Sequence, residues 1–175
     1  MKRLTAILLS VLFIAFCFSA CGGVSNEGDS VYDTIEMENI TFQFPKYWNY
    51  QEQGGVTQIK TNEGDRGIQF YSTAYTEEFE STTKESLKAK LETSYSQNNL
   101  ELSNFQFKKD TTKGFDMFVA DFDIENVETP FHETVYMAHL ENKVYMFMVI
   151  CEHNSNNEFA TIFYNSLAKI TKIKE

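Results

Sequence analysis

The sequence predicts an α+β fold in which helices pack on the faces of an antiparallel β-sheet. Segments in which apolar and polar residues alternate, the period of a β-strand, recur from residue 40 onward. Two capping boxes each precede a stripe of apolar residues at helical spacing. The segment 144–150 is apolar throughout, so we expect it to be buried on both faces and the sheet to be covered on both.

Seven strands are expected, separated by turns rich in Gly, Asn and Asp. In the first, Ile40, Phe42 and Phe44 alternate with polar residues, and Pro45 ends the strand. The last three should form a meander, because the link at residues 141–142 is short enough for a tight hairpin. The other expected strands are 56–60, 67–75, 102–108, 115–124, 131–140 and 143–151.

Two helices are expected, one for each face of the sheet. The first begins at the capping box 82–85 and presents Leu87, Leu91 and Tyr95 as a narrow stripe. The second begins at the capping box 155–158 and has a broader apolar face. That face consists of Phe159, Ile162, Phe163, Leu167 and Ile170.

The N-terminus has the features of a secretory signal. Basic residues precede an uncharged run at 4–16, and small residues follow it. The quartet 18–21, Phe-Ser-Ala-Cys, resembles a bacterial lipobox in which Phe18 stands at the usual Leu position. The resemblance implies cleavage of residues 1–20 and a diacylglyceryl group on Cys21, holding the protein on the outer face of the bacterial cell membrane. The alternative is an uncleaved membrane helix over 4–20.

The mature chain would carry a flexible tether and one domain. Residues 21–37 begin with small and polar residues, and we assign them to the lipidated Cys21 and the tether. Residues 38–175 form the single domain. Cleavage leaves 155 residues, with 13 basic and 25 acidic side chains and a formal charge of −12. Because such an acidic surface repels phosphate backbones, no nucleic-acid partner is expected.

The domain resembles the PsbP-like family, which takes its name from an extrinsic subunit of photosystem II. The resemblance implies a PsbP-like α/β/α sandwich and a non-enzymatic binding or assembly role. It supplies no partner-contacting residues for this chain. It is carried by the segment 40–45 leading to Trp48, the helix after the first strands, the meander, and a final helix with Phe159, Ile162, Phe163, Ser166 and Leu167.

A group of acidic residues is the first candidate site. If the strands 115–124 and 131–140 pair so that Val119 faces Val135, Asp121 lies opposite Glu133. Like charges directly opposed destabilise a strand pair. A divalent cation held by Asp121, Asp123 and Glu133 would relieve the repulsion. The alternatives are a solvated end of the sheet, or a nearby lysine such as Lys108 or Lys109 that screens the pair.

Cys151 and His132 are the second candidate. A two-residue turn pairs Leu140 with Lys143, which brings His132 opposite Cys151. A Cys beside a His is a potential thiolate nucleophile. The alternative is a buried small apolar residue beside a hydrogen-bonded His. By the same register His139 points to the opposite face, so a zinc site is not expected.

An aromatic cluster is the third candidate. Tyr47, Trp48 and Tyr50 follow the first expected strand. If exposed, they would contact a ligand or a protein partner. If buried, they would close the end of the sheet.

These observations predict a lipid-anchored extracytoplasmic binding or assembly module of the bacterial envelope without catalysis of its own. Its partners would be the membrane, through diacylglyceryl-Cys21, and an envelope protein. No cofactor is expected apart from the divalent cation considered above. Two alternatives remain open: an envelope hydrolase that uses Cys151 or the Asp121 group, and a lipoprotein that senses a divalent ion or another ligand.

Overall fold

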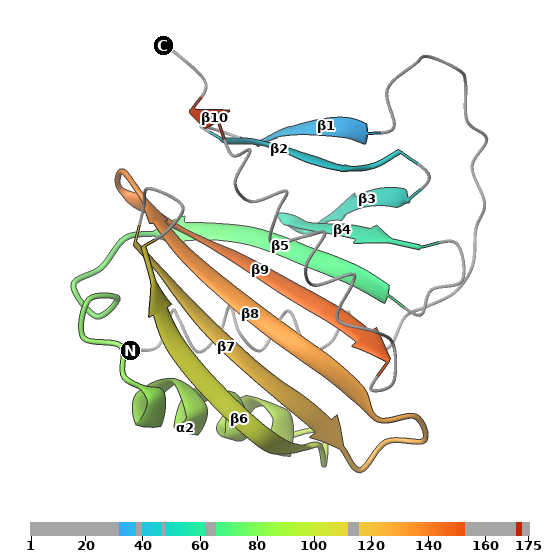
Figure 1. Cartoon of the computed structure of the whole chain (residues 1–175), viewed down its shortest axis with the longest axis vertical. Coiled ribbons are helices and arrows are strands. Elements are labelled where there is room, and N and C mark those ends of the chain that lie inside the picture. The colour runs from blue at the N-terminus through green and yellow to red at the C-terminus, as the bar shows by residue number, and fades with distance from the viewer. Residues whose placement is uncertain are drawn as a thin grey trace.

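The computed structural model describes residues 32–37, 40–46, 48–61, 66–111, 116–152 and 171–172, which form two antiparallel sheets (Figure 1). The smaller sheet has the order β1-β2-β10, and the larger has the order β3-β4-β5-β9-β8-β7-β6. The strands are β1 (Tyr32–Met37), β2 (Ile40–Pro45), β3 (Asn49–Gln53), β4 (Val56–Lys60), β5 (Arg66–Ala74), β6 (Glu101–Asp110), β7 (Asp116–Glu125), β8 (Phe131–Leu140), β9 (Lys143–Glu152) and β10 (Thr171–Lys172).

Strand β9 occupies the centre of the large sheet, between β5 and β8. The side chains of residues 144–149 are buried on both faces of the sheet, as the sequence predicts. Ile150, which was also expected to be buried, is partly exposed. One face, called here the α2 face, includes Met146 and Met148 in its cluster. The opposite face includes Tyr145 and Phe147. The sheet therefore separates two apolar clusters.

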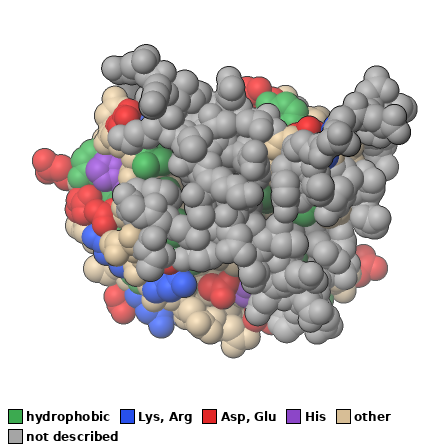
Figure 2. All heavy atoms as spheres, turned by 45° about the horizontal axis from the view of Figure 1, so that its top comes forward, with side chains coloured by type: hydrophobic (Ala, Val, Ile, Leu, Met, Phe, Trp, Pro, Cys, Tyr) green, Lys and Arg blue, Asp and Glu red, His purple; other side chains and the backbone are tan. Residues whose placement is uncertain are grey.

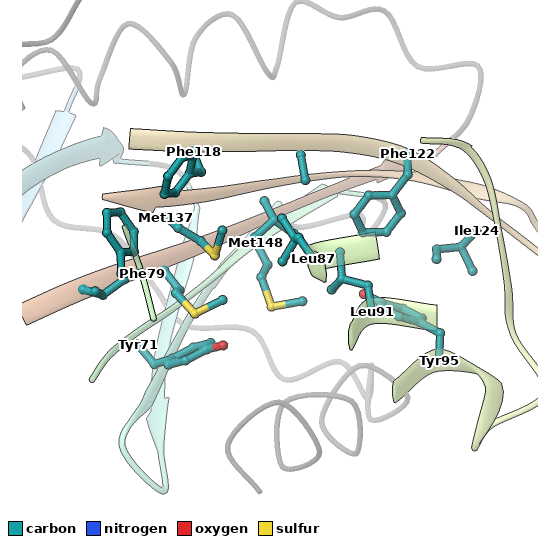
Figure 3. Packing of buried hydrophobic residues seen from close by; sticks show 14 of the residues in the cluster. Tyr71, Phe79, Leu87, Leu91, Tyr95, Phe118, Phe122, Ile124, Met137 and Met148 are labelled. Atoms are coloured by element: carbon teal, nitrogen blue, oxygen red, sulfur yellow. The ribbon is translucent and has the colours of Figure 1, made fainter. Parts of the chain in front are cut away.

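Helix α2 (Lys84–Ser96) covers part of one face of the large sheet and lies close to β6 (Figure 1). Leu87, Leu91 and Tyr95 are buried, as their spacing predicts. They pack against sheet residues such as Phe122 and Met148 (Figure 3). Among the residues that the structure describes, no helix has both the length and the apolar character needed to cross a membrane.

The predicted fold class is wrong. The described residues contain a large antiparallel sheet and one short helix, not a sheet with helices packed on its faces. On the opposite face, Phe44 of β2 and Trp48 belong to the buried cluster, so residues outside any helix provide cover there. An apolar strand requires cover on both faces but does not specify helices. The helix predicted from residue 155 lies outside the described residues.

Three strands had no counterpart in the sequence prediction. Strand β1 lies within the range assigned to the tether and pairs with β2 along its full length. Strand β3 pairs with β4 across the turn at Gly54 and Gly55, whose φ angles of 62° and 79° suit glycine. The short strand β10 pairs with β2.

The start of α2 provides the first testable prediction. The N-cap is Thr83, whose side chain accepts a hydrogen bond from the Ser86 amide at 3.2 Å, while Ser86 Oγ accepts one from the Thr83 amide at 3.0 Å. The capping box thus begins one residue later than predicted. Thr83→Ala should lower the free energy of unfolding by about 1 kcal/mol. Thr82→Ala is the matched control in urea denaturation, and an equal or larger loss there would contradict the assignment.

Candidate functional site

The pairing of β7 with β8 differs by one residue from the register assumed above. Val119 pairs with Tyr136, and Asp121 pairs with Thr134. Because side chains alternate along a strand, this shift moves Glu133 to the α2 face, away from Asp121. Two separate polar clusters result, one on each face of the sheet.

The first cluster surrounds His132 on the face opposite α2. The His132 ring donates from Nδ1 to Asp123 Oδ1 at 2.7 Å and from Nε2 to Asp121 Oδ1 at 2.6 Å. Asp121 also accepts from the Thr134 hydroxyl at 2.7 Å, and Asp123 accepts from Asn104 Nδ2 at 2.7 Å. Asn104 lies in the irregular part of β6, with φ at 54°, where the register with β7 shifts. The bulge thereby brings an amide to the buried carboxylate.

Both carboxylates favour the protonated imidazole. The hydrogen bond to Asp121 is the largest cause that raises the pKa of His132 to about 9, and Asp123 adds to it. Burial raises the pKa of Asp121, but hydrogen bonds from His132 and Thr134 outweigh burial and leave that pKa below its ordinary value. At neutral pH the cluster is therefore an imidazolium held between two carboxylates.

The three acidic residues proposed as metal ligands do not lie together. Asp121 and Asp123 flank His132, whereas Glu133 lies on the other face and is 1% exposed. The cation that lies between the two aspartates is a protonated histidine of the same chain, which offsets one of their two negative charges. In the described part of the chain, no group of three His, Cys, Asp or Glu side chains is arranged to hold a metal ion.

The pairing of His132 with Cys151 agrees with the predicted hairpin, in which Leu140 pairs with Lys143. Cys151 is 3% exposed within the apolar cluster of the opposite face. Both ring nitrogens of His132 donate to carboxylates, so neither is available to accept a proton from a thiol. The geometry thus opposes a role for Cys151 as an activated nucleophile.

The second cluster lies between the sheet and α2, and the sequence analysis did not identify it. The Tyr95 hydroxyl donates to Glu133 Oε2 at 2.5 Å. Burial raises the pKa of Glu133 to about 7, against the opposing effects of Tyr95 and His132. Tyr71 of β5 lies near enough for the Glu133 charge to raise its pKa, although burial is the larger cause. The position of Glu133 on the α2 face follows from the observed pairing of β7 with β8 and not from the register assumed in the sequence analysis.

A pocket opens beside this second cluster. It holds about 60 Å³ of water-accessible space between β5, β8, β9, the loop after β5 and the first half of α2. Leu87, Met137 and Met146 contribute to its apolar wall, and Tyr71 lines it as well. Figure 3 shows Tyr71, Met137 and Met148 in the same buried cluster. Polar residues, including Lys90, complete the lining.

The aromatic candidates lie in different environments. Trp48 is 8% exposed and belongs to the buried cluster with Phe44. Tyr50 is 47% exposed and donates to Glu52 Oε2 at 3.2 Å. Of the two, only Tyr50 has a largely solvent-exposed side chain. Tyr47 and the lipidation candidate Cys21 lie outside the described residues.

The visible charged side chains do not gather in a single patch. Figure 2 shows acidic groups spread over the described part of one face, with basic groups among them. Two ion pairs among the described residues are exposed, Lys88 with Glu92 and Lys109 with Asp116. Such pairs contribute little to stability. The acidic side chains in view are thus spread over this surface and do not form one acidic patch.

Comparison with known proteins identifies the fold. No protein-family model matches the chain, and no curated protein matches it. The solution structure of cyanobacterial PsbP (CyanoP) from Synechocystis sp. PCC 6803 matches with a TM-score of 0.64 and 13% sequence identity, covering 89% of this chain and 98% of that one. The chain therefore has a PsbP-like fold.

Two other solved structures are similar. The Ran-binding protein Mog1p of Saccharomyces cerevisiae matches with a TM-score of 0.50 and 12% identity, covering 77% of this chain and 83% of that one. A protein from Bacteroides thetaiotaomicron VPI-5482 has a TM-score of 0.51 and 12% identity, covering 78% of this chain and 46% of that one. Identities this low establish a shared fold and no shared activity.

Glu133 should make stability fall as pH rises through the acidic range. Its folded pKa of about 7 exceeds its ordinary 4.5, so the native state retains a proton that the unfolded state loses. The stabilisation is present below pH 4.5 and is lost by about pH 7, at a cost on the order of 3 kcal/mol. Glu133→Gln should flatten this part of the urea-unfolding profile. The exposed Glu77→Gln is the control, and an unchanged slope in Glu133→Gln would refute the effect.

His132 should add a second loss of stability at higher pH. Its folded pKa of about 9 exceeds the ordinary 6.5, so its contribution is complete below pH 6.5 and disappears as pH rises through 9. His132→Gln should remove this dependence between pH 6.5 and 9 in thermal unfolding, with His139→Gln as the control on the other face. If the wild type and His132→Gln lose stability in parallel over this range, the imidazolium does not stabilise the fold.

Proposed function

We propose that this protein is a lipid-anchored binding or assembly module on the outer face of a bacterial cell membrane, with no catalysis of its own. The observation that carries the proposal is the PsbP-like fold, which matches CyanoP over 98% of that chain. Mog1p, a Ran-binding protein, uses a similar fold. The similarity to these two proteins supports the proposal that this chain is a binding module.

The site geometry supports a role without catalysis. The strongest catalytic candidate, His132, is a charged group held by two aspartates, and Cys151 beside it is buried. A general base needs an unprotonated nitrogen within reach of its substrate. The arrangement instead suits a structural element that anchors the β7–β8 hairpin and the bulge in β6.

The lipid anchor supports a membrane location and lowers the affinity that binding requires. Residues 1–20 have the features of a lipoprotein signal, and two acyl chains on Cys21 would hold the domain at the membrane. Tethering two proteins to one surface raises their effective concentration. A partner embedded in the same envelope could therefore bind through a small contact such as one that includes Tyr50.

The anchor is tested by labelling the full-length chain in bacterial cells with an alkyne fatty acid. The wild type should incorporate the label and sediment with membranes, because the Cys21 thiol accepts the diacylglyceryl group. Cys21→Ser should lose the label. Incorporation that persists in Cys21→Ser, or a wild type recovered unlabelled from the cytoplasm, would exclude lipidation at this residue.

Partner binding is tested with a photo-crosslinking amino acid in place of Tyr50 in the anchored protein. One discrete crosslinked envelope protein should appear, since Tyr50 is the exposed one of the two aromatic candidates that the structure describes. The same probe in place of the exposed Glu92 on α2 is the control. Identical adducts from both positions would indicate crowding at the membrane, and the absence of any adduct from Tyr50 would exclude this contact.

A further inference from the structure

The pocket between α2 and the large sheet is a recess that several elements build together. Residues of β5, β8, β9, α2 and the loop after β5 line it. Contacts to the sheet hold this loop: Tyr75 stacks on His139 with ring centroids 4.1 Å apart, and its amide donates to the Asn142 carbonyl at 2.8 Å. Phe79, which lines the recess, packs on Phe118 with centroids 4.8 Å apart. The recess is therefore bounded by parts of the fold that are anchored to one another.

Most of the lining is apolar. It includes Leu87 and Leu91 from α2, and Met137 and Met146 from the sheet. All four side chains are buried, so a group must enter the recess to contact them. Methionine side chains adapt to the shape of their neighbours, so this lining suits a flexible aliphatic group.

Tyr71 adds an unpaired polar atom to this apolar lining. The residue is 4% exposed and lines the recess, and no protein group in the described part of the chain forms a hydrogen bond with its hydroxyl. Native proteins satisfy about nine in ten of their buried polar groups, so an unpaired hydroxyl requires an explanation. Burial raises the pKa of Tyr71, which keeps the group a neutral phenol at neutral pH. The phenol can both donate and accept a hydrogen bond.

The charges around the recess favour an uncharged occupant. Lys90 and Glu78 both belong to the lining, where their formal charges cancel, and both are exposed to solvent. A charged group that enters an apolar recess without a buried partner loses its hydration. Glu133 does not line the recess, but its charge acts on Tyr71 and opposes an anion at the hydroxyl. An alcohol matches the phenol, because it is neutral and both donates and accepts.

The size of the recess limits the ligand to a short chain. The water-accessible space is about 60 Å³, and one water molecule requires roughly 10–15 Å³. An ordered water also needs two to four polar partners. Of the lining residues that the structure describes, only Tyr71 has a buried polar atom without a partner. An alkyl chain therefore suits the remaining space better than ordered water does.

We propose that this recess is a binding site for a short-chain aliphatic alcohol. The alcohol forms a hydrogen bond with the Tyr71 hydroxyl, and its alkyl chain lies against the leucine and methionine side chains. The site is independent of the Tyr50 contact and of the lipid anchor. Its failure would leave the proposed function untouched, and the converse also holds.

The test measures the binding of 1-butanol and 1-chlorobutane to the full-length chain by NMR of its methionine methyl groups. Both ligands should shift the Met137 and Met146 signals to saturation, because both residues line the recess. Met117, in the cluster on the opposite face, should not respond. 1-Chlorobutane has the same alkyl chain without a hydroxyl. Butyrate and n-butylammonium should bind at least about tenfold more weakly than 1-butanol, because each would lose the hydration of its charge.

Tyr71→Phe tests the hydrogen bond, because it keeps the ring and removes only the hydroxyl. It should raise the dissociation constant of 1-butanol about tenfold and leave that of 1-chlorobutane within about twofold. Comparing the two proteins for each ligand cancels the difference in hydration between the ligands. The ligand-free variant should be at least as stable as the wild type, since it loses an unpaired hydroxyl. Tyr145→Phe, on the opposite face, is the matched control and should change neither constant.

A second variant tests the place of binding while the Tyr71 hydroxyl stays intact. Val144 lines the recess and is buried, so Val144→Ile adds a methyl group to the space that the alkyl chain would occupy. This variant should weaken both ligands. Unchanged binding of both would place them outside the recess.

Other outcomes also overturn the proposal. Equal dissociation constants for 1-butanol in the wild type and Tyr71→Phe would mean a pocket without a polar contact. Equal weakening of both ligands in Tyr71→Phe would mean that the hydroxyl shapes the recess and does not bind the alcohol. No shift of Met137 or Met146 with either ligand would mean that the recess takes up no alkyl chain. Tighter binding of butyrate or n-butylammonium than of 1-butanol would mean that a charged residue sets the specificity.

Discussion

The double burial of β9 is the constraint on which the rest of the structure depends. A strand with apolar side chains on both faces must lie inside a sheet and between two layers of cover. Its neighbours β5 and β8 supply the hydrogen bonds, α2 contributes cover on one face, and Phe44 and Trp48 contribute on the other. The faces of the two polar clusters follow from the alternation of side chains along β8, which places His132 on the face opposite α2 and Glu133 on the α2 face.

Two neighbouring hairpins show how far the sequence predicts register. The β8–β9 pairing was predicted because its two-residue turn at Glu141 and Asn142 leaves one register, in which His132 faces Cys151. The β7–β8 link is longer and both strands carry apolar residues on both faces, so the pattern does not choose between registers. The observed register differs by one residue from the predicted one, so Asp121 pairs with Thr134 and not with Glu133. The predicted register therefore did not indicate that Glu133 is buried on the other face.

Neither the fold class nor the second polar cluster could be predicted from the sequence, and the reasons are related. Strand β3, Asn49-Tyr50-Gln51-Glu52-Gln53, has no apolar alternation and is specified by its pairing with β4. The cover provided by Phe44 and Trp48 depends on contacts distant in sequence, which local patterns do not encode. The Glu133–Tyr95 contact spans 38 residues and joins a strand to a helix. In contrast, local signals such as the Leu87, Leu91 and Tyr95 stripe predicted α2 correctly.

The adjacent residues His132 and Glu133 differ in how completely their polar atoms are hydrogen-bonded, and this difference bears on function. His132 lies partly exposed with both ring nitrogens paired, so its burial is compensated within the chain. Glu133 lies deeper with one oxygen unpaired, and Gln69 and Tyr71 on the same face of the sheet also carry an unpaired oxygen. A fold selected for stability alone would replace such atoms with apolar groups, since each unpaired group costs about 1–3 kcal/mol. Of these groups, Tyr71 also lines the pocket beside α2, so a bound group that forms a hydrogen bond with its hydroxyl would offset part of that cost.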